Sequence, residues 1–389
     1  MRTLRNTRFS LAALAALAAV ALIGGAARPA AAQTYTVKNL GVLPGLTHSS
    51  AWAVNERGQV VGKSWKDATR TTPRIQHAFL WTPGGTAGSA SNPQMQDLGG
   101  LDGKNEVGLG VNNAGQVIGS DNVLSLPFLW DAVNGLRNMN DPSVSDAASR
   151  GWTLIETWKI NDAGQVIGRY RTSSGQTRQY LWNPVTPNAA YGTLSDLRQP
   201  DGFDAPRHNA LNNLGQTTGW MTPTGGGTRH LFLWNPTDPA TGTFSANAAT
   251  GAYTDLGTAG VLNATNIVGK GINDAAQITG FVVTAGSSYG FVQDASGATA
   301  LLPLNSNPNA INNAAQIVGS YSSRAFLWDM NNGMRDLNTL MVAGDTAGMT
   351  LKNALDINNA TVNGLNKGQI VGEAYVNKQG TRAFLLTPQ

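Results

Sequence analysis

A pattern of apolar and polar positions repeats along the chain from residue 33 onward. Each copy starts with an apolar residue and Asn, passes through a short turn to Gly-Gln or Ala-Gln, continues with apolar residues and reaches a Gly. The first copy runs from Val54 to Gly62, and six more begin at Val111, Ile160, Leu211, Ile272, Ile311 and Ile357. Self-similarity at a regular spacing is typical of repeat architectures, so the pattern predicts one array of seven units over residues 33–389.

An aromatic block follows each turn, and it is apolar at consecutive positions. In the first unit it reads Ala78, Phe79, Leu80, Trp81. Side chains alternate between the two faces of a strand, so Phe79 and Trp81 are expected on one face and Ala78 and Leu80 on the other. Such a strand is predicted to be buried on both faces, as in a sheet packed between two neighbours.

A short third block, of the Asp-Leu-Gly kind seen at Asp97 to Gly99, supplies a closing strand in most units. Four short strands repeated about every 50 residues predict an all-β fold, a β-propeller of seven four-stranded blades. The segment Tyr35 to Gly41 looks like a closing strand, whereas the chain stops after the aromatic block Phe384 to Leu386. The N-terminal strand is therefore predicted to complete the last blade, which removes open sheet edges.

The Asn-x-x-Gly-Gln segments predict tight hairpins. Asn followed by two residues and a Gly suits a type I turn whose fourth residue is left-handed. Ala276 and Ala315 replace that Gly in two copies, and these turns are expected to be strained or differently shaped. In the seventh copy an insertion, Thr361 to Lys367, is expected to enlarge the hairpin tip. The predicted structural turn residues are Asn55, Gly58, Gln59, Asn112, Gly115, Gln116, Asn161, Gly164, Gln165, Asn212, Gly215 and Gln216.

These motifs together are similar to the HAF repeat family of extracellular proteins. The family is named for a His-Ala-Phe element, which stands here as His77, Ala78, Phe79, while Arg324 and Arg382 occupy the His position in other units. The resemblance covers nearly the whole chain after residue 33. It implies a secreted, β-propeller-like repeat array with no established biochemical activity.

The N-terminal segment predicts export. Residues 1–32 carry Arg2, Arg5 and Arg8, an apolar run from Leu11 to Ile23, and a small-residue stretch, which is the order of a secretory signal peptide cleaved before Gln33. The apolar run is short for a membrane span and no second long one follows, so a secreted, extracellular or periplasmic protein is expected.

Charge and composition narrow the function classes. Removing residues 1–32 lowers Lys plus Arg from 27 to 23, equal to the 23 Asp plus Glu, so the electrostatic argument for nucleic acid is lost. Without cysteine there are no disulfides, thiolate metal sites or Cys nucleophiles. Asn-rich turns containing Asp162 or Asp274 offer few carboxylates for calcium, and no cofactor or metal is predicted. Gly286 to Gly290 matches Gly-x-Ser-x-Gly but is interpreted as a hairpin loop because no helix follows.

A few residues stand out as candidates for ligand binding. Five of the ten Trp fill the aromatic block and are assigned to the core, whereas Trp65 and Trp220 lie just past the Gly that ends their second strands and are freer to be exposed. His208 beside Arg207, and His230 beside Arg229, are placed where they could share a surface in the fourth unit.

The sequence favours a noncatalytic binding or scaffold protein whose loops hold a glycan or an extracellular protein. The loops carry little charge, which favours neutral partners. One alternative is a glycoside hydrolase or lyase acting through paired carboxylates; a carboxylate cluster facing the central channel would support it. The other is a structural surface or matrix component, and the oligomeric state stays open. Carboxylate candidates outside the repeat are Glu106, Glu156, Asp201, Asp204 and Asp345.

Overall fold

The computed structural model describes residues 33–69, 74–101, 105–121, 123–204, 206–237, 245, 250–342, 348–362 and 365–389. The predicted signal peptide, residues 1–32, lies outside the described residues. Thr34 to Gln389 form one compact unit. No described helix is long and apolar enough to cross a membrane.

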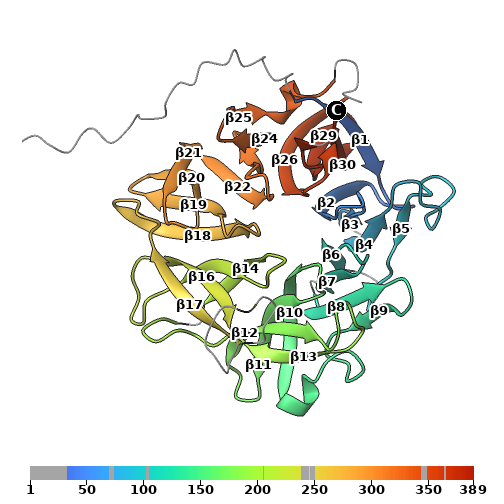
Figure 1. Ribbon diagram of the computed structural model, residues 1–389. Coiled ribbons are helices and arrows are strands. Elements are labelled where there is room, and N and C mark those ends of the chain that lie inside the picture. The colour runs from blue at the N-terminus through green and yellow to red at the C-terminus, as the bar shows by residue number, and fades with distance from the viewer. Residues whose placement is uncertain are drawn as a thin grey trace, which may run out of the picture. The chain divides into compact units, whose positions relative to one another are not determined.

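The described residues form seven four-stranded antiparallel sheets arranged as blades in a ring, a seven-bladed β-propeller (Figure 1). Blades 1 to 3 contain β2 (His48–Val54), β3 (Val60–Lys66), β4 (Ile75–Trp81) and β5 (Met95–Asp97); β6 (Glu106–Val111), β7 (Val117–Asp121), β8 (Leu126–Asp131) and β9 (Gly135–Asn138); and β10 (Trp152–Ile160), β11 (Val166–Thr172), β12 (Thr177–Pro184) and β13 (Gly192–Asp196). Blades 4 to 6 contain β14 (Arg207–Leu211), β15 (Thr217–Met221), β16 (His230–Thr237) and β17 (Thr250–Gly257); β18 (Ala264–Ile272), β19 (Ile278–Thr284), β20 (Ser287–Gln293) and β21 (Thr299–Leu304); and β22 (Ser306–Ile311), β23 (Ile317–Tyr321), β24 (Arg324–Asp329) and β25 (Gly333–Asp336).

Blade 7 is built from both ends of the repeat domain. Its strands are β26 (Met349–Ile357), β29 (Ile370–Val376), β30 (Gly380–Pro388) and the N-terminal strand β1 (Tyr35–Gly41). Strand β1 pairs antiparallel with β30, from Tyr35 opposite Pro388 to Asn39 opposite Phe384. The predicted closure of the ring by strand pairing between the two ends is therefore confirmed.

Two short 3-10 helices, η1 (Ala148–Arg150) and η2 (Leu337–Thr339), and a small hairpin complete the described elements. The hairpin, β27 (Thr361–Val362) with β28 (Leu365–Asn366), lies in the insertion of the seventh unit. Across that insertion the backbone N–H of Asn358 still donates to the Gln369 backbone carbonyl at 3.1 Å. The prediction that the insertion enlarges one hairpin tip is confirmed.

The aromatic block forms the packing between blades. Phe79 and Trp81 pack in a cluster with Leu385 of blade 7, whereas Ala78 and Leu80 pack in another with blade 2. Each block therefore contacts the preceding blade through its aromatic residues and the following blade through its aliphatic ones. The five Trp of the block are all buried, as predicted: Trp81, Trp130, Trp182, Trp234 and Trp328. Burial of one such side chain contributes about 2–3 kcal/mol.

The hairpin turns have the predicted geometry. Gly58 has φ +71°, its amide donates to the Asn55 carbonyl at 3.0 Å, and the Asn55 amide donates to Gln59 at 3.1 Å. Ala276 and Ala315 adopt φ +57° and +56°, with the same pair of backbone bonds. These two turns are therefore strained in the same shape as the others.

Every first strand carries a β-bulge that the sequence patterns did not predict. The register shifts around the residue three positions before the turn Asn in all seven blades. In the first blade the shift falls between Ala51 and Ala53, leaving Trp52 as the extra residue. A bulge redirects side chains and strengthens the local twist, and here it does so where the strand borders the central cavity.

Candidate functional site

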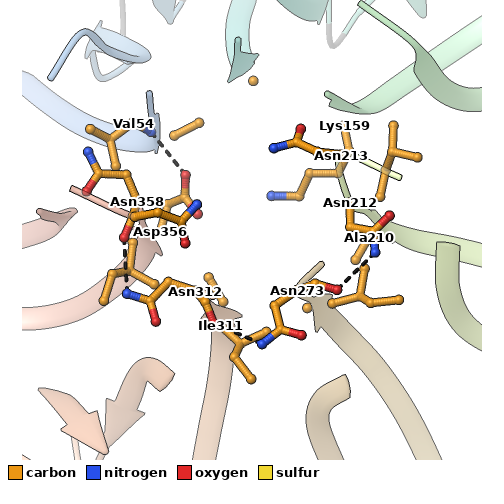
Figure 2. A pocket seen from close by; sticks show the side chains of 18 of the residues that line it. Val54, Lys159, Ala210, Asn212, Asn213, Asn273, Ile311, Asn312, Asp356 and Asn358 are labelled. Atoms are coloured by element: carbon orange, nitrogen blue, oxygen red, sulfur yellow. Dashed lines mark hydrogen bonds between the residues drawn. The ribbon is translucent and has the colours of Figure 1, made fainter. Parts of the chain in front are cut away.

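The seven Asn turns are joined into a closed ring around the propeller axis. The Asn55 side-chain amide donates to the Asn112 carbonyl of the next blade at 2.9 Å, and the same bond repeats until Asn358 donates back to the Asn55 carbonyl at 2.8 Å. Figure 2 shows three consecutive links of this ring on one side of the central cavity. The donors in order are Asn55, Asn112, Asn161, Asn212, Asn273, Asn312 and Asn358.

The chemistry of Asn explains why that residue stands at each turn. The Asn55 side-chain oxygen accepts the backbone N–H groups of Arg57 and Gln59, both at 3.0 Å. Its amide nitrogen donates to the Gln59 side chain at 2.8 Å and to the next blade. An Asn side chain has two donors and room for two acceptor bonds, so all four are used in a buried position. Asp would lack the donors, and Ser would lack the reach.

A second ring is formed by the residue after each Asn. The backbone N–H of Glu56 donates to the Asn113 side-chain oxygen at 2.8 Å, and the pattern continues until the Asn359 N–H donates to Glu56 Oε1 at 2.9 Å. The side chains of this second ring, in order, are Glu56, Asn113, Asp162, Asn213, Asp274, Asn313 and Asn359. This position accepts a hydrogen bond from the preceding blade, so it needs a side-chain oxygen.

The rings border a central cavity of about 170 Å³, lined by the first strands of the blades and by their turns (Figure 2). Lys159 and Asp356 extend into it from opposite sides. Asp356 accepts the Val54 N–H at 3.0 Å, and burial raises the pKa of its carboxyl. Lys270 donates to Asn307 and Asn309 at 3.1 and 2.8 Å, and burial together with the nearby Lys159 lowers its pKa to about 8.

Carboxylates therefore face the channel, but each has a structural partner. Glu56, Asp162 and Asp274 each accept a backbone N–H of the preceding blade at 2.9 Å, and amide side chains separate them around the ring. Within the residues described, no group of three or more His, Asp or Glu is arranged to hold a metal ion. The channel carboxylates are thus accounted for by contacts between blades.

A different set of side chains lies farther from the Asn turns, in the middle of the first and second strands. Two register positions meet there: the bulge residue of the first strand and the residue after the second-strand Gly. In blade 1 these are Trp52 and Lys63, whose ammonium lies 5.6 Å from the indole centroid. In blade 3 they are Trp158 and Arg169, and in blade 5 the roles are exchanged, with Lys270 6.0 Å from the Phe281 ring.

In blades 3 and 4 this arrangement extends into what we call the Trp–Arg ladder. The guanidinium carbons of Arg169 and Arg207 lie 5.6 and 5.2 Å from the Trp158 centroid. In blade 4, Arg229 stacks over Trp220 at 3.8 Å. The rungs are adjacent because Arg207 and Trp220 are paired across β14 and β15. All members are half-buried; they are Glu156, Trp158, Arg169, Arg207, Trp220 and Arg229.

Among the predicted ligand residues, Trp220 belongs to the ladder and Trp65 to a smaller cluster in blade 1. Both lie inside their second strands and are half-buried rather than free past the strand end. The Trp65 ring stacks on His48 at 5.2 Å, and its indole N–H donates to Asp67 at 3.1 Å. Lys63 also lies over this ring at 5.3 Å.

The expectation that His208 and His230 share a surface is wrong, because His208 is fully buried. Its Nδ1 lies 2.5 Å from the Thr217 hydroxyl and its Nε2 2.7 Å from the Tyr253 hydroxyl. The Tyr253 hydroxyl donates to the Leu197 carbonyl, so it accepts from Nε2, and the neutral ring satisfies every group. Burial lowers the pKa of His208 to about 3. The residues that do gather are their neighbours, Arg207 and Arg229.

His230 instead fills a position that repeats between blades. Its Nδ1 lies 2.9 Å from Asp255, and His77 contacts Asp97 in the same way at 2.7 Å. Arg178 with Asp196 and Arg324 with Asp336 are equivalent pairs. The His of the His-Ala-Phe element is thus one version of a cation that pairs with the Asp of the closing strand.

The carboxylates proposed for a hydrolase do not converge. Glu106 is fully buried in β6, and Glu156 is paired with Arg169 in the ladder. Asp201 and Asp204 lie exposed in the loop before β14. Asp345 lies outside the described residues. Of the segment Gly286 to Gly290, only Gly286 lies in the turn between β19 and β20; Ser287 to Gly290 begin β20, so the predicted loop is mostly strand.

Sequence reasoning named Arg207 and Arg229 only as neighbours of His208 and His230, and it missed Trp158 and Arg169, although a signal for the last two was present. Aligning the units on the turn Asn and the second-strand Gly places Trp158 at the bulge of the first strand and Arg169 just after the second-strand Gly. At those positions blade 2 has Leu109 and Ser120, which have no such character. Blades 1 and 3 thus share an indole and a cation at these two positions, which blade 2 lacks.

No family model and no curated protein sequence matches the chain. Among solved structures, a streptogramin B lyase is similar over 92% of this chain and 98% of its own, at 11% identity and a TM-score of 0.47. A virginiamycin B lyase from Staphylococcus aureus covers 91% of this chain and 99% of its own, at 12% identity and 0.45. The β-propeller domain of the Trilobed protease from Pyrococcus furiosus covers 75% and 96%, at 8% identity and 0.37. Similarity at this level carries no argument about activity.

Proposed function

We propose that this is a noncatalytic binding protein located outside the cytoplasm, and that the Trp–Arg ladder is where it holds a glycan. The observation that carries the proposal is the ladder itself: two indole rings and three guanidinium groups gathered from two successive blades. Indole rings bury large area at little conformational cost, and stacked guanidinium groups present directional donors. Both are what recognition of a sugar ring with polar substituents requires.

The rest of the molecule supports a binding role over a catalytic one. Glu56, Asp162 and Asp274 each accept a backbone N–H of the preceding blade, and Asn side chains separate them around the second ring. Retaining and inverting glycosidases need two carboxyl groups held about 5 to 10 Å apart around the scissile bond. The ladder contributes one carboxylate, Glu156, and it is paired with Arg169. The predicted signal peptide and the resemblance to the extracellular HAF repeat family support the location.

The test is a glycan and polysaccharide binding array on the purified protein without its predicted signal peptide, read alongside reducing-sugar release from every ligand bound. We expect binding without release. The double variant Trp158→Ala, Trp220→Ala should weaken binding at least about tenfold, as loss of buried aromatic contacts does. Tyr375→Ala, at a side chain that is 48% exposed on blade 7, is the matched control and should bind normally.

Sugar release would overturn the proposal that the protein is noncatalytic. Glycan binding that survives the double variant would remove the ladder from the proposal. Binding of no glycan at all, combined with concentration-dependent self-association of the protein, would favour a structural surface component instead.

A further inference from the structure

We infer that the ligand of the Trp–Arg ladder is an acidic glycan, whose carboxylate or sulfate groups are held by Arg207 and Arg229. This inference rests on the proposed function and names the class of glycan. It departs from the expectation of a neutral partner, which came from the low charge of the loops. The charge that matters lies in the ladder, on Arg207 at the start of β14 and on Arg229 in the loop before β16.

The charges within the ladder are not balanced. It holds three guanidinium groups and one carboxylate, and Glu156 is engaged by Arg169, whose Nε donates to Glu156 Oε2 at 2.9 Å. Arg207 and Arg229 have no carboxylate partner among the described residues. Two half-buried positive charges are thus left unbalanced on one surface.

Arg207 and Arg229 have guanidinium N–H donors that few or no protein acceptors engage. A guanidinium carries five N–H donors in a planar fork. Arg207 contacts the Trp158 ring but has no hydrogen-bond acceptor within the described part of the chain, and Arg229 donates to Asn266 at 3.5 Å, the long limit for such a bond. Half-buried donors without protein acceptors are suited to the oxygens of a ligand.

Contacts with indole rings hold the guanidinium groups of Arg207 and Arg229 in place before a ligand binds. The guanidinium carbon of Arg229 lies over the Trp220 ring, 3.8 Å from its centroid, and that of Arg207 lies over Trp158 at 5.2 Å. Stacking fixes the plane of a guanidinium while its N–H edge stays free, which favours bidentate contact with a carboxylate or sulfate. Arg207 begins β14 and Arg229 lies in the loop before β16, so the two side chains come from separate segments of blade 4. An extended chain with repeated acidic groups fits them better than one small anion.

Electrostatics within the ladder agrees with this geometry. Burial, followed by the charges of Arg169 and Arg229, lowers the pKa of Arg207, while Glu156 acts in the opposite direction. Like charges held together in a partly desolvated place repel each other, and an anion bound between them relieves that repulsion. Arginine nevertheless stays protonated across the ordinary pH range.

The experiment measures affinity for three polymers of matched length: a polyuronate, a sulfated glycan and a neutral glucan. We expect both acidic polymers to bind and the neutral one to bind at least tenfold more weakly, with acidic binding falling as salt is raised. Arg207→Gln should weaken acidic binding about tenfold or more, because it removes a charged hydrogen-bond donor. Arg207→Lys keeps the charge without the fork and should give an intermediate loss.

Two controls separate binding from folding and from net charge. Arg57→Gln removes the same charge from an exposed position on the turn side and should leave affinity unchanged. A melting curve of Arg207→Gln close to that of the original protein shows that the fold is intact; if this variant does not fold, Arg229→Gln replaces it.

The outcomes distinguish the two proposals. Equal affinity for the neutral and acidic polymers, or an Arg57→Gln loss equal to that of Arg207→Gln, would overturn the acidic class while leaving glycan binding in place. Binding to none of the three polymers, with binding to an acidic peptide instead, would overturn the proposed function itself. Lowering the pH below the uronate pKa should abolish polyuronate binding and spare the sulfated glycan.

Discussion

The Asn turns and the bulges of the first strands are built on different principles. On the turn side every blade supplies an Asn with the same role, including the interrupted seventh unit. At the bulge, the equivalent register position holds Leu109 in blade 2, Trp158 in blade 3 and Asn309 in blade 6. The difference teaches that positions filled alike in all units carry the fold, and that positions where one unit departs are where function is to be sought.

The strongest test of this comparison is to break one link of the Asn ring. Asn212→Ala removes the bonds that Asn212 makes to Gln216 and to the Asn273 carbonyl, together with two that its oxygen accepts. Because these groups are buried, we expect the free energy of unfolding to fall by roughly 3–5 kcal/mol in denaturant titration. Asn332→Ala, at an exposed turn, should cost about 0.5 kcal/mol or less. Equal effects of the two changes would mean that the ring adds nothing beyond a local turn.

His208 sharpens the comparison, because it is a departure from the repeat that is buried and structural. It stands opposite Gly219, where blades 1 and 2 have Ala51 and Gly108. Its pKa is about 3 in the folded protein and near 6.5 when unfolded, so below pH 6.5 the unfolded chain binds the extra proton. Stability should therefore fall as the pH is lowered from about 6.5 towards 3, by up to about 1.4 kcal/mol per pH unit.

Urea titration of the original protein and of His208→Gln between pH 7 and pH 4 measures this slope. The variant should be less stable at pH 7 but should lose the part of the pH dependence that comes from the buried imidazole. Parallel curves for the two proteins would show that acid sensitivity arises from other groups.

The smallest expected effect concerns the two turns that lack Gly. A residue with a Cβ in the left-handed region costs roughly 1–2 kcal/mol, partly offset by the chain entropy that Gly adds to the unfolded state. Ala276→Gly and Ala315→Gly should therefore each raise stability by about 0.5–1 kcal/mol. Ala275→Gly, beside the first and without positive φ, should lower it by a similar amount, so the sign of the change is the measurement that matters.

The fold was accessible from the sequence because its determinants are local. The alternation in Ala78 to Trp81 indicates a strand buried on both faces, and the closing-strand character of Tyr35 to Gly41 indicates how the ring closes. The turn pattern likewise predicts the left-handed Gly58. Each of these signals is contained within a few residues.

The candidate site was only partly accessible, because it depends on contacts between blades. Trp220 was singled out, but the partner that stacks on it, Arg229, approaches from the loop before β16. Arg207 in blade 4 contacts Trp158 in blade 3, which lies 49 residues earlier in the sequence. Trp158 stands at a β-bulge that no strand pattern indicates. The hydrogen bonds between Asn turns were missed for the same reason: an Asn in a type I turn is explained locally, and its donors to the next blade become visible only once the ring closes.

The odd number of blades has a consequence for the second ring of side chains. Carboxylates stand in blades 1, 3 and 5, as Glu56, Asp162 and Asp274, each flanked by Asn on both sides. Strict alternation of two kinds of residue closes only around an even number of members, and seven is odd. One pair of like neighbours is unavoidable, and it falls between Asn313 and Asn359, at the junction with the blade assembled from both chain ends. An even-bladed relative of this architecture could alternate without a seam; this molecule, by its count of blades, cannot.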